Sequence, residues 1–196
     1  MATWNIAVRG QEIVGSLVAA AAILVAQTVF IPSLSWPETL QPKVSVSGNQ
    51  VSVITPSGMN QMIVMGHDLR PTDIKFEDLT FSGRMDLKIL DTLGASQIFY
   101  KVYLFSPVDG IYIFNNEMSE IPCLGADEKR RQLVGACYHA SACENWEERY
   151  AVSPEGALFL VERTGTYCEP NGKSYRYTDN FRNGERVSSK VKIIDR

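Results

Sequence analysis

The sequence has few of the side chains on which enzyme active sites usually depend. Its only two histidines are His67 and His139, and no G-x-S-x-G segment marks a nucleophile turn. Glu147 and Glu148 form an acidic cluster with Glu144, but neighbouring residues of a strand point to opposite faces, so they cannot flank one glycosidic bond. An active site needs a nucleophile with its base, paired acids or a metal. We therefore expect a protein that is not an enzyme.

Net charge is also small, at −3, with a pI of about 5.5. Nucleic-acid binding is not expected, because it requires a basic face. Hydrophobic residues make up 45% of the chain and charged residues 21%, which is ordinary for a globular protein with a buried core. The last stretch is richer in cations, with Asp179 and Glu185 between them, and this mixture predicts a solvated face. These cations are Lys173, Arg176, Arg182, Arg186, Lys190 and Lys192.

Charge is absent from Ile13 to Ile31, a run long enough at 1.5 Å per residue to cross about 28 Å of hydrocarbon. One interpretation is a signal peptide cleaved after Ala26, and another is an uncleaved single-pass anchor. Glu12 at the edge of the run slightly disfavours the first, and a buried soluble helix is a third, weaker interpretation. Either export interpretation places the rest of the chain outside the cytoplasm. We assign residues 1–31 to this segment, 32–42 to a proline-rich linker and 43–196 to an extracytoplasmic domain.

Cysteine is absent from the first half of the chain, and no C-x-x-C pair exists, which argues against a zinc site. An even number of cysteines after an export segment predicts two disulfide bonds in an oxidising compartment. The four are Cys123, Cys137, Cys143 and Cys168.

Strand geometry favours one of the three possible pairings. The turn Ser153–Gly156 folds Trp146–Val152 back on Ala157–Arg163, and extending this ladder brings Cys143 close to Cys168. Cys123 and Cys137 likewise flank a turn-like segment. We predict these two bridges, each worth about 2–4 kcal/mol.

Helical periodicity is absent beyond the N-terminal segment, and alternating patterns replace it. Val44 and Val46 begin a three-stranded meander that ends near Met65, and Ile98 to Phe105 is a strongly β-forming run. Further short runs follow at regular spacing, separated by turn signals such as Asp109-Gly110. The pattern predicts an all-β domain, either a meander or a partial β-propeller-like arrangement, preceded by the hydrophobic helix.

Oxygen-bearing side chains alternate around a glycine in the segment that begins at Asp78. Alternate side chains on a curling backbone point to one centre, and Gly83 permits the turn with positive φ that closes the curl. The loop is not an EF-hand, because Ile89 stands where a bidentate Glu is required. The predicted Ca²⁺ ligands are the side chains of Asp78, Thr80, Ser82 and Asp86 and the backbone carbonyl of Arg84.

This segment resembles the D-x-N-x-D-G-x-x-D-L loop of FG-GAP-like (α-integrin-like) proteins. The sequence from about Asp73 to Arg163, which includes this segment, is similar to the small periplasmic lysozyme-inhibitor and immunity proteins of Gram-negative bacteria. Some of these protect against peptidoglycan-cleaving effectors of type IV secretion. The resemblance implies a partial, propeller-like fold with one calcium loop. Thr80 and Ser82 replace the family's Asn and Asp, so fewer charges predict weaker binding, and a loop shaped by local hydrogen bonds is the alternative.

An inhibitor presents a rigid loop to a cleft, and two stretches fit this requirement. Residues 136–145 carry Tyr138 and His139, and residues 166–174 carry Asn171 at a turn flanked by Tyr167 and Tyr175. Tyrosine is a common anchor at interface centres, although these rings could also cap the ends of the β domain.

The resemblance therefore predicts a binding protein that is periplasmic, secreted or anchored in the inner membrane facing the periplasm. Its expected partner is a peptidoglycan hydrolase or lysozyme-like protein, which it would inhibit by steric occlusion. The rival interpretation is a single-pass structural subunit of an envelope complex, held in the membrane by Ile13 to Ile31.

Overall fold

The computed structural model describes residues 42–194. The hydrophobic segment Ile13 to Ile31 and nearly all of the linker lie outside the described residues. Within 42–194, no helix is both long and apolar enough to span a membrane.

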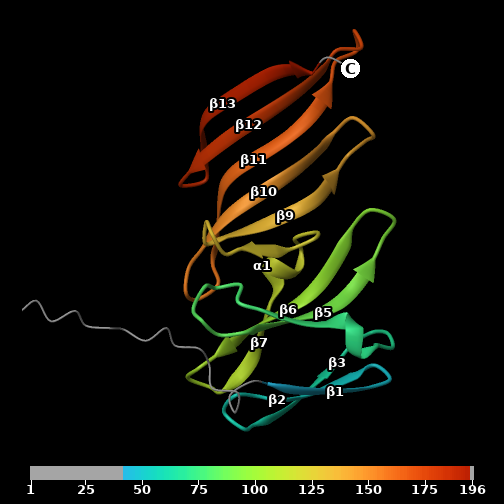
Figure 1. The fold of residues 1–196 in the computed structure, drawn as a ribbon, viewed down its shortest axis with the longest axis vertical. Helices are drawn as coiled ribbons and strands as arrows, with labels where there is room; N and C mark the ends of the chain where they lie inside the picture. Colours follow the sequence, from blue (N-terminus) through green and yellow to red (C-terminus); the bar gives the residue numbers. More distant parts are fainter. Residues whose placement is uncertain (1–41, 195–196) are drawn as a thin grey trace, which may run out of the picture. The chain divides into compact units, whose positions relative to one another are not determined.

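Three antiparallel sheets follow one another along the chain, and in each the strands pair in sequence order (Figure 1). The first is the predicted meander, with the pairs turning at Gly48-Asn49 and after Ile54. Its strands are β1 (Lys43–Ser47), β2 (Gln50–Ile54) and β3 (Asn60–Val64).

The second sheet has four strands, and one of its faces packs on the first sheet. Val51, Val53 and Ile63 of the first sheet share a buried cluster with Leu87, Ile89 and Tyr112 of the second. A short 3₁₀ turn, η2 (Pro71–Asp73), joins the two sheets. The strands are β4 (Ile74–Glu77), β5 (Asp86–Leu93), β6 (Ile98–Ser106) and β7 (Ile111–Asn115).

The third sheet has six strands, and its first two cover part of the other face of the second sheet. Tyr100 and Val102 of β6 lie in a second buried cluster with Leu124 and with Leu133 of β9. A single helical turn, α1 (Asn116–Ser119), adds Met118 to it. The strands are β8 (Gly125–Asp127), β9 (Gln132–His139), β10 (Asn145–Val152), β11 (Leu158–Cys168), β12 (Ser174–Arg182) and β13 (Glu185–Ile194).

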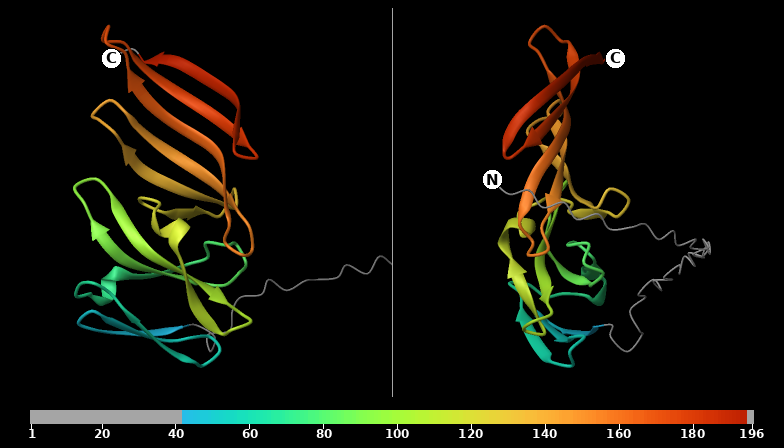
Figure 2. Two further views of the ribbon diagram at one scale, coloured as in Figure 1. Left: turned by 180° about the vertical axis from the view of Figure 1, so that it is seen from behind. Right: turned by 90° about the vertical axis from the view of Figure 1, so that its left-hand side faces the viewer.

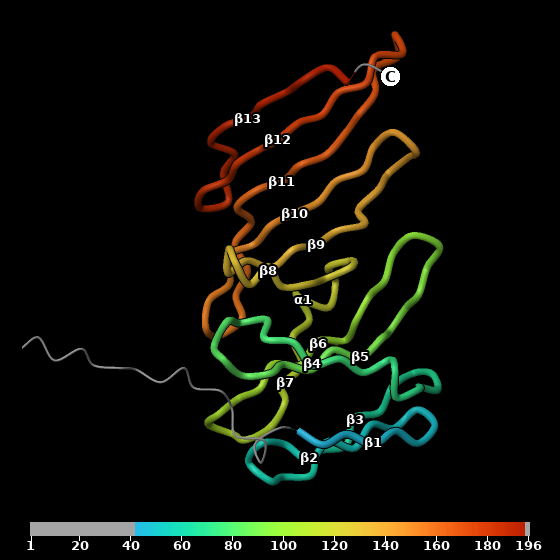
Figure 3. The backbone as a smooth tube through the Cα atoms, in the orientation of Figure 1, coloured from blue at the N-terminus to red at the C-terminus, as the bar shows by residue number. Residues whose placement is uncertain are grey.

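The all-β prediction is confirmed, because the described residues form three antiparallel sheets with almost no helix. Figure 3 labels the two strands that the sequence did not reveal, β4 and β8, which are only 4 and 3 residues long. Sequence periodicity needs a longer window than that to separate a strand from a loop.

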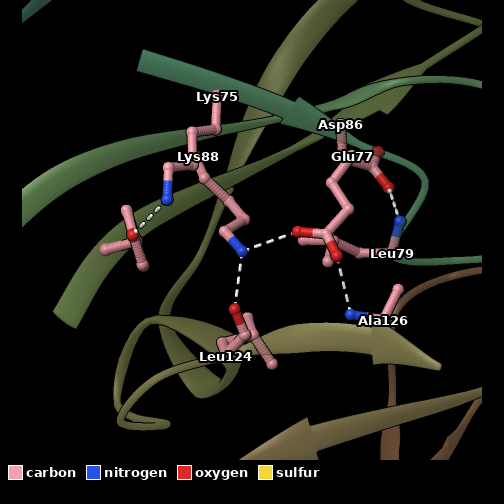
Figure 4. Close-up of polar contacts among 8 residues, drawn as sticks. Lys75, Glu77, Leu79, Asp86, Lys88, Leu124 and Ala126 are labelled. Atoms are coloured by element: carbon pink, nitrogen blue, oxygen red, sulfur yellow. Dashed lines mark hydrogen bonds and ion pairs between the residues drawn. The ribbon is translucent and has the colours of Figure 1, made fainter. Parts of the chain in front are cut away.

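Strand β5 is buried on both faces, and this places a cation in the interior. Leu87 and Ile89 face the first sheet, whereas Lys88 between them faces the second cluster and is 3% exposed. Its ammonium group lies 2.6 Å from the carboxylate of Glu77 and donates to the carbonyl of Leu124 at 2.6 Å (Figure 4). It also lies 4.7 Å from the centre of the Tyr100 ring. A buried charge requires such compensation, because removing it from water is costly.

Glu77 extends this ion pair into the third sheet. Its second oxygen accepts the backbone N–H of Ala126 in β8 at 2.7 Å. One carboxylate therefore holds β5 through Lys88 and β8 through its backbone, and so joins the second sheet to the third.

We predict that Glu77→Gln lowers the free energy of unfolding by roughly 3 kcal/mol, because it leaves the Lys88 charge buried without its counter-ion. Lys88→Met should cost less, since Glu77 is 30% exposed in its side chain and keeps the Ala126 N–H. Denaturant titration of the two variants measures both changes. Equal losses, or a Glu77→Gln variant as stable as the wild type, would contradict this role for the pair.

Candidate functional site

Both predicted disulfide bonds are present. Cys123 is bonded to Cys137 and Cys143 to Cys168, with Cα–Cα distances of 5.9 and 5.8 Å. The first ties β9 to the segment that follows α1. The second ties the turn after β9 to the end of β11, so it joins the two stretches from which the contact residues were predicted.

The joined stretches form a surface that we call the disulfide-tied loops, residues 139–145 and 168–174. Beside the bridge, the hydroxyl of Thr166 donates to the carbonyl of Cys143 at 2.9 Å. The tip of the second loop is closed by backbone hydrogen bonds between Glu169 and Lys173 and between Gly172 and Glu169, each 3.0 Å long. These contacts fix the loops' conformation before any partner arrives.

Three of the predicted contact residues lie on or beside this second loop. Tyr167 and Tyr175 face each other across β11 and β12 with their rings stacked at 5.0 Å. The Tyr175 hydroxyl donates to Glu169 at 3.1 Å, and the Asn171 side-chain amide donates to the same carboxylate at 2.9 Å. Asn171 is exposed at the tip. The structure therefore brings Tyr167, Asn171 and Tyr175 together.

His139 is exposed, and it connects the first loop to a hairpin that sequence reasoning did not include. Its Nε2 atom lies 3.1 Å from the hydroxyl oxygen of Ser96, in the turn between β5 and β6. Gln97 of the same turn donates to the carbonyl of Cys137 at 3.2 Å. The Gly94-Ala95-Ser96 run indicates a turn, but nothing in the sequence says which loop that turn touches.

Tyr138 is placed differently from the other predicted contacts. It is half-buried, its ring stacks on Trp146 at 5.4 Å, and its hydroxyl lies 3.2 Å from that of Tyr150. Burial raises the pKa of Tyr138 to about 12. Tyr138 thus packs against the second buried cluster, and a contact role for it stays a prediction.

Glu147 and Glu148 of the acidic cluster lie on opposite faces of β10, as the strand pattern predicts. Glu148 is 7% exposed and accepts a hydrogen bond from Nε of Arg163 at 2.7 Å, and Nη2 of the same arginine forms an ion pair with it at 2.6 Å. Its other oxygen accepts the Tyr150 hydroxyl. Glu147 instead pairs with Arg149 at 3.0 Å. Each carboxylate is part of an ion pair, and the two do not face one another.

The segment from Asp78 curls as predicted, and backbone hydrogen bonds hold the curl. The two carboxylate oxygens of Asp78 accept the N–H groups of Ser82 at 3.0 Å and Gly83 at 2.7 Å. Gly83 has a φ of 78°. The Thr80 hydroxyl donates to that of Ser82 at 3.0 Å. These contacts close the loop between Asp78 and Gly83.

Asp86 closes the curl from inside the protein. It is 1% exposed, and its two oxygens accept the N–H groups of Leu79 at 3.0 Å and Phe105 at 2.9 Å. Desolvation raises the pKa of Asp86 from 3.8 to about 6, with a smaller contribution from the charge of Asp78. Figure 4 shows Asp86 and Leu79 beside the Glu77 cluster.

The loop offers a donor set of two carboxylates with hydroxyls, and within the described part of the chain no group of three acidic, histidine or cysteine side chains is arranged to hold a metal ion. The carboxylate oxygens already accept backbone N–H groups, so local hydrogen bonds can close the loop. Each of these oxygens retains a lone pair for a cation. Calcium binding through Asp78, Thr80, Ser82, Asp86 and the Arg84 carbonyl stays a prediction.

The same loop forms one wall of a groove of about 520 Å³. Thr80, Ser82 and Arg84 line it on this side, and Ile113 and Phe114, both more than 40% exposed, line it on the other. A change in the conformation of the loop would therefore change the groove.

Comparison with known proteins defines the fold and leaves the family open. No protein-family model matches the chain, and no curated protein matches its sequence. The structure is similar to a solved structure titled "Structure of a Xanthomonas Type IV Secretion System related protein". The TM-score is 0.56 at 15% identity, with 79% of this chain and 86% of that chain covered. At this identity the likeness shows a shared fold, and it shows no lysozyme-inhibitor or FG-GAP-like family for this chain.

We predict that Asp86→Asn changes the pH dependence of stability. An acid whose pKa is raised on folding stabilises the native state most below its unfolded pKa, so this contribution is lost as the pH rises from about 4 to about 6. The wild type should lose roughly 3 kcal/mol over that range through Asp86. Asp86→Asn, which also loses one acceptor, should lack this component.

Urea titrations at several pH values give the difference in unfolding free energy between the two proteins. That difference should shrink as the pH rises through the range. Parallel curves would show that Asp86 is not a buried acid with a raised pKa.

Proposed function

We propose that this chain is an exported binding protein of the bacterial envelope that inhibits a peptidoglycan-cleaving hydrolase by steric occlusion. The observation that carries this proposal is the Cys143–Cys168 bridge, which joins both predicted contact loops into one constrained surface. Two disulfide bonds favour an oxidising compartment. The shared fold with a protein described as related to type IV secretion supports an envelope context.

The disulfide-tied loops have the physical properties of an inhibitor's contact surface. The bridge and the hydrogen-bonded tip reduce the conformational entropy lost on binding, which otherwise weakens association. Tyr167 and Tyr175 are rigid, amphipathic side chains, of the type that dominates interface energies. Lys173 is exposed beside the tip and complements the paired carboxylates of a glycosidase cleft.

Inhibition by this surface requires no chemistry from the chain itself. The loop tip fills the cleft that the glycan strand would occupy. The expected location is periplasmic, secreted or at the inner membrane facing the periplasm. Calcium at the Asp78 loop would have a structural role, since that loop adjoins the β6 and β7 groove rather than the disulfide-tied loops.

A second candidate function is a single-pass structural subunit of an envelope complex. The uncharged run Ile13 to Ile31 favours it, because that run is long enough to remain as an anchor. Intact-mass analysis of the mature protein separates the two, since an inhibitor released by cleavage would lack this segment.

We predict stoichiometric inhibition of at least one enzyme when the full protein is titrated against several lysozyme types and lytic enzymes. Asn171→Glu should raise the inhibition constant about tenfold or more, because it places a negative charge at the loop tip, against the carboxylates of the cleft. The measurement is muramidase activity on peptidoglycan, with and without calcium.

Asn116→Glu on α1 is the matched control, since it adds the same charge at another exposed position, and it should inhibit like the wild type. Loss of inhibition on chelation would assign a metal to the Asp78 loop. No inhibition and no complex across the panel would refute the proposed function.

A further inference from the structure

Among residues 42–194, strand β13 is an open edge of the third sheet. It is the last strand in the sheet order, and Figure 2 shows β13 lying along the outer edge of the C-terminal sheet. Nine of its 10 residues are exposed. The outer side of an edge strand presents a row of backbone N–H and C=O groups to which another strand can pair.

One face of this edge is cationic. In the pairing of β12 with β13, Arg176 is directly opposite Lys192, and Thr178 is opposite Lys190. The three cations line a shallow trough of about 350 Å³ together with Thr178, Asn180 and Glu162. The charged groups are therefore gathered on one side of the sheet, beside its free edge.

The cations of this trough have no ion pair among the described residues, unlike several others in the same sheet. Arg149, Arg163 and Arg186 each contact a carboxylate. Like charges placed directly opposite on two strands destabilise a sheet. An anion over Arg176, Lys190 and Lys192 would remove that repulsion.

The opposite face of the same edge is apolar. Val191 is opposite Tyr177 and Ile193 is opposite Tyr175, and the two aliphatic side chains are 50% and 60% exposed. Side chains along a strand alternate between faces. A strand that pairs with β13 would therefore place every second residue over the cations and the residues between them beside Val191 and Ile193.

We propose that β13 docks an extended acidic segment of a partner protein, which adds to the sheet as a further strand. The segment alternates carboxylate and apolar side chains. At the spacing of paired strands, about 4.8 Å, its carboxylates reach Lys190 and Lys192 directly. Self-pairing of β13 is disfavoured, because it would bring these lysines against their own copies. The C-terminal end of β13 adjoins the disulfide-tied loops, because Ile194 pairs with Ser174, but the docking surface is the outer side of β13, so the inference goes beyond the proposed inhibition.

The test uses the full protein and a fluorescent synthetic decapeptide in which glutamate alternates with valine and threonine. Anisotropy should show saturable binding that weakens as salt is added. A peptide with lysine at every glutamate position should not bind. Amide hydrogen exchange should slow in β13 when the glutamate peptide is present, which simple charge attraction would not cause.

Lys190→Glu with Lys192→Glu should weaken peptide binding about tenfold or more, and the neutral pair Lys190→Gln with Lys192→Gln should weaken it less. Lys129→Glu with Arg130→Glu is the matched control, because it reverses two exposed charges in the turn before β9, and it should bind like the wild type. Circular dichroism confirms that each variant is folded.

The proposal is overturned by any of three results. These are no saturable binding of the glutamate peptide, equal binding by the charge-reversed variant, and unchanged amide exchange in β13. Self-association of the protein through β13 would also overturn it, since the assigned occupant is then a second copy.

Discussion

The ion pair of Lys88 and Glu77 is the interaction on which the arrangement of the sheets depends. A lysine that is 3% exposed can remain charged only beside a carboxylate and other polar partners. Glu77 provides the carboxylate, Leu124 a carbonyl, and the same Glu77 accepts the N–H of Ala126. Because Cys123 precedes Leu124 directly, this cluster also sets where the third sheet and its first disulfide begin. Asp86, two residues before Lys88, accepts the N–H of Leu79 and so attaches the Asp78 loop to β5.

Much of the fold could be predicted from the sequence, because most strands alternate clearly and end at recognisable turns. The meander of β1 to β3 and the hairpin of β10 with β11 are examples. Strands β4 and β8 could not be predicted, since they are held by tertiary contacts, such as the one from Glu77 to Ala126, rather than by their own pattern. The burial of Lys88 in β5 could not be predicted for a related reason. A charged side chain is expected at the surface until its buried partners are known.

The parts of the candidate site that depend on local hairpin geometry could be predicted from the sequence. The face of the sheet on which a side chain lies could not always be predicted. Hairpin geometry was sufficient for the Cys143–Cys168 bridge. The inward position of Tyr138 depends on a register shift between Trp146 and Glu148, which the sequence does not show. The C-terminal cations were predicted to form a mixed face with Asp179. The structure divides these cations between the two faces of the sheet. Asp179 lies on the face of Arg163 and pairs with Arg186, whereas Arg176 and Lys192 share the other face.

We propose that a constrained, disulfide-tied surface works outside the cytoplasm. The most direct measurement is the redox state of the four cysteines in protein taken from its native cells, with free thiols alkylated at lysis and disulfides mapped by mass spectrometry. We predict Cys123–Cys137 and Cys143–Cys168 peptides and no alkylated cysteine. Alkylated Cys143 and Cys168 would contradict this proposal, because the two loops would then be untied in the cell.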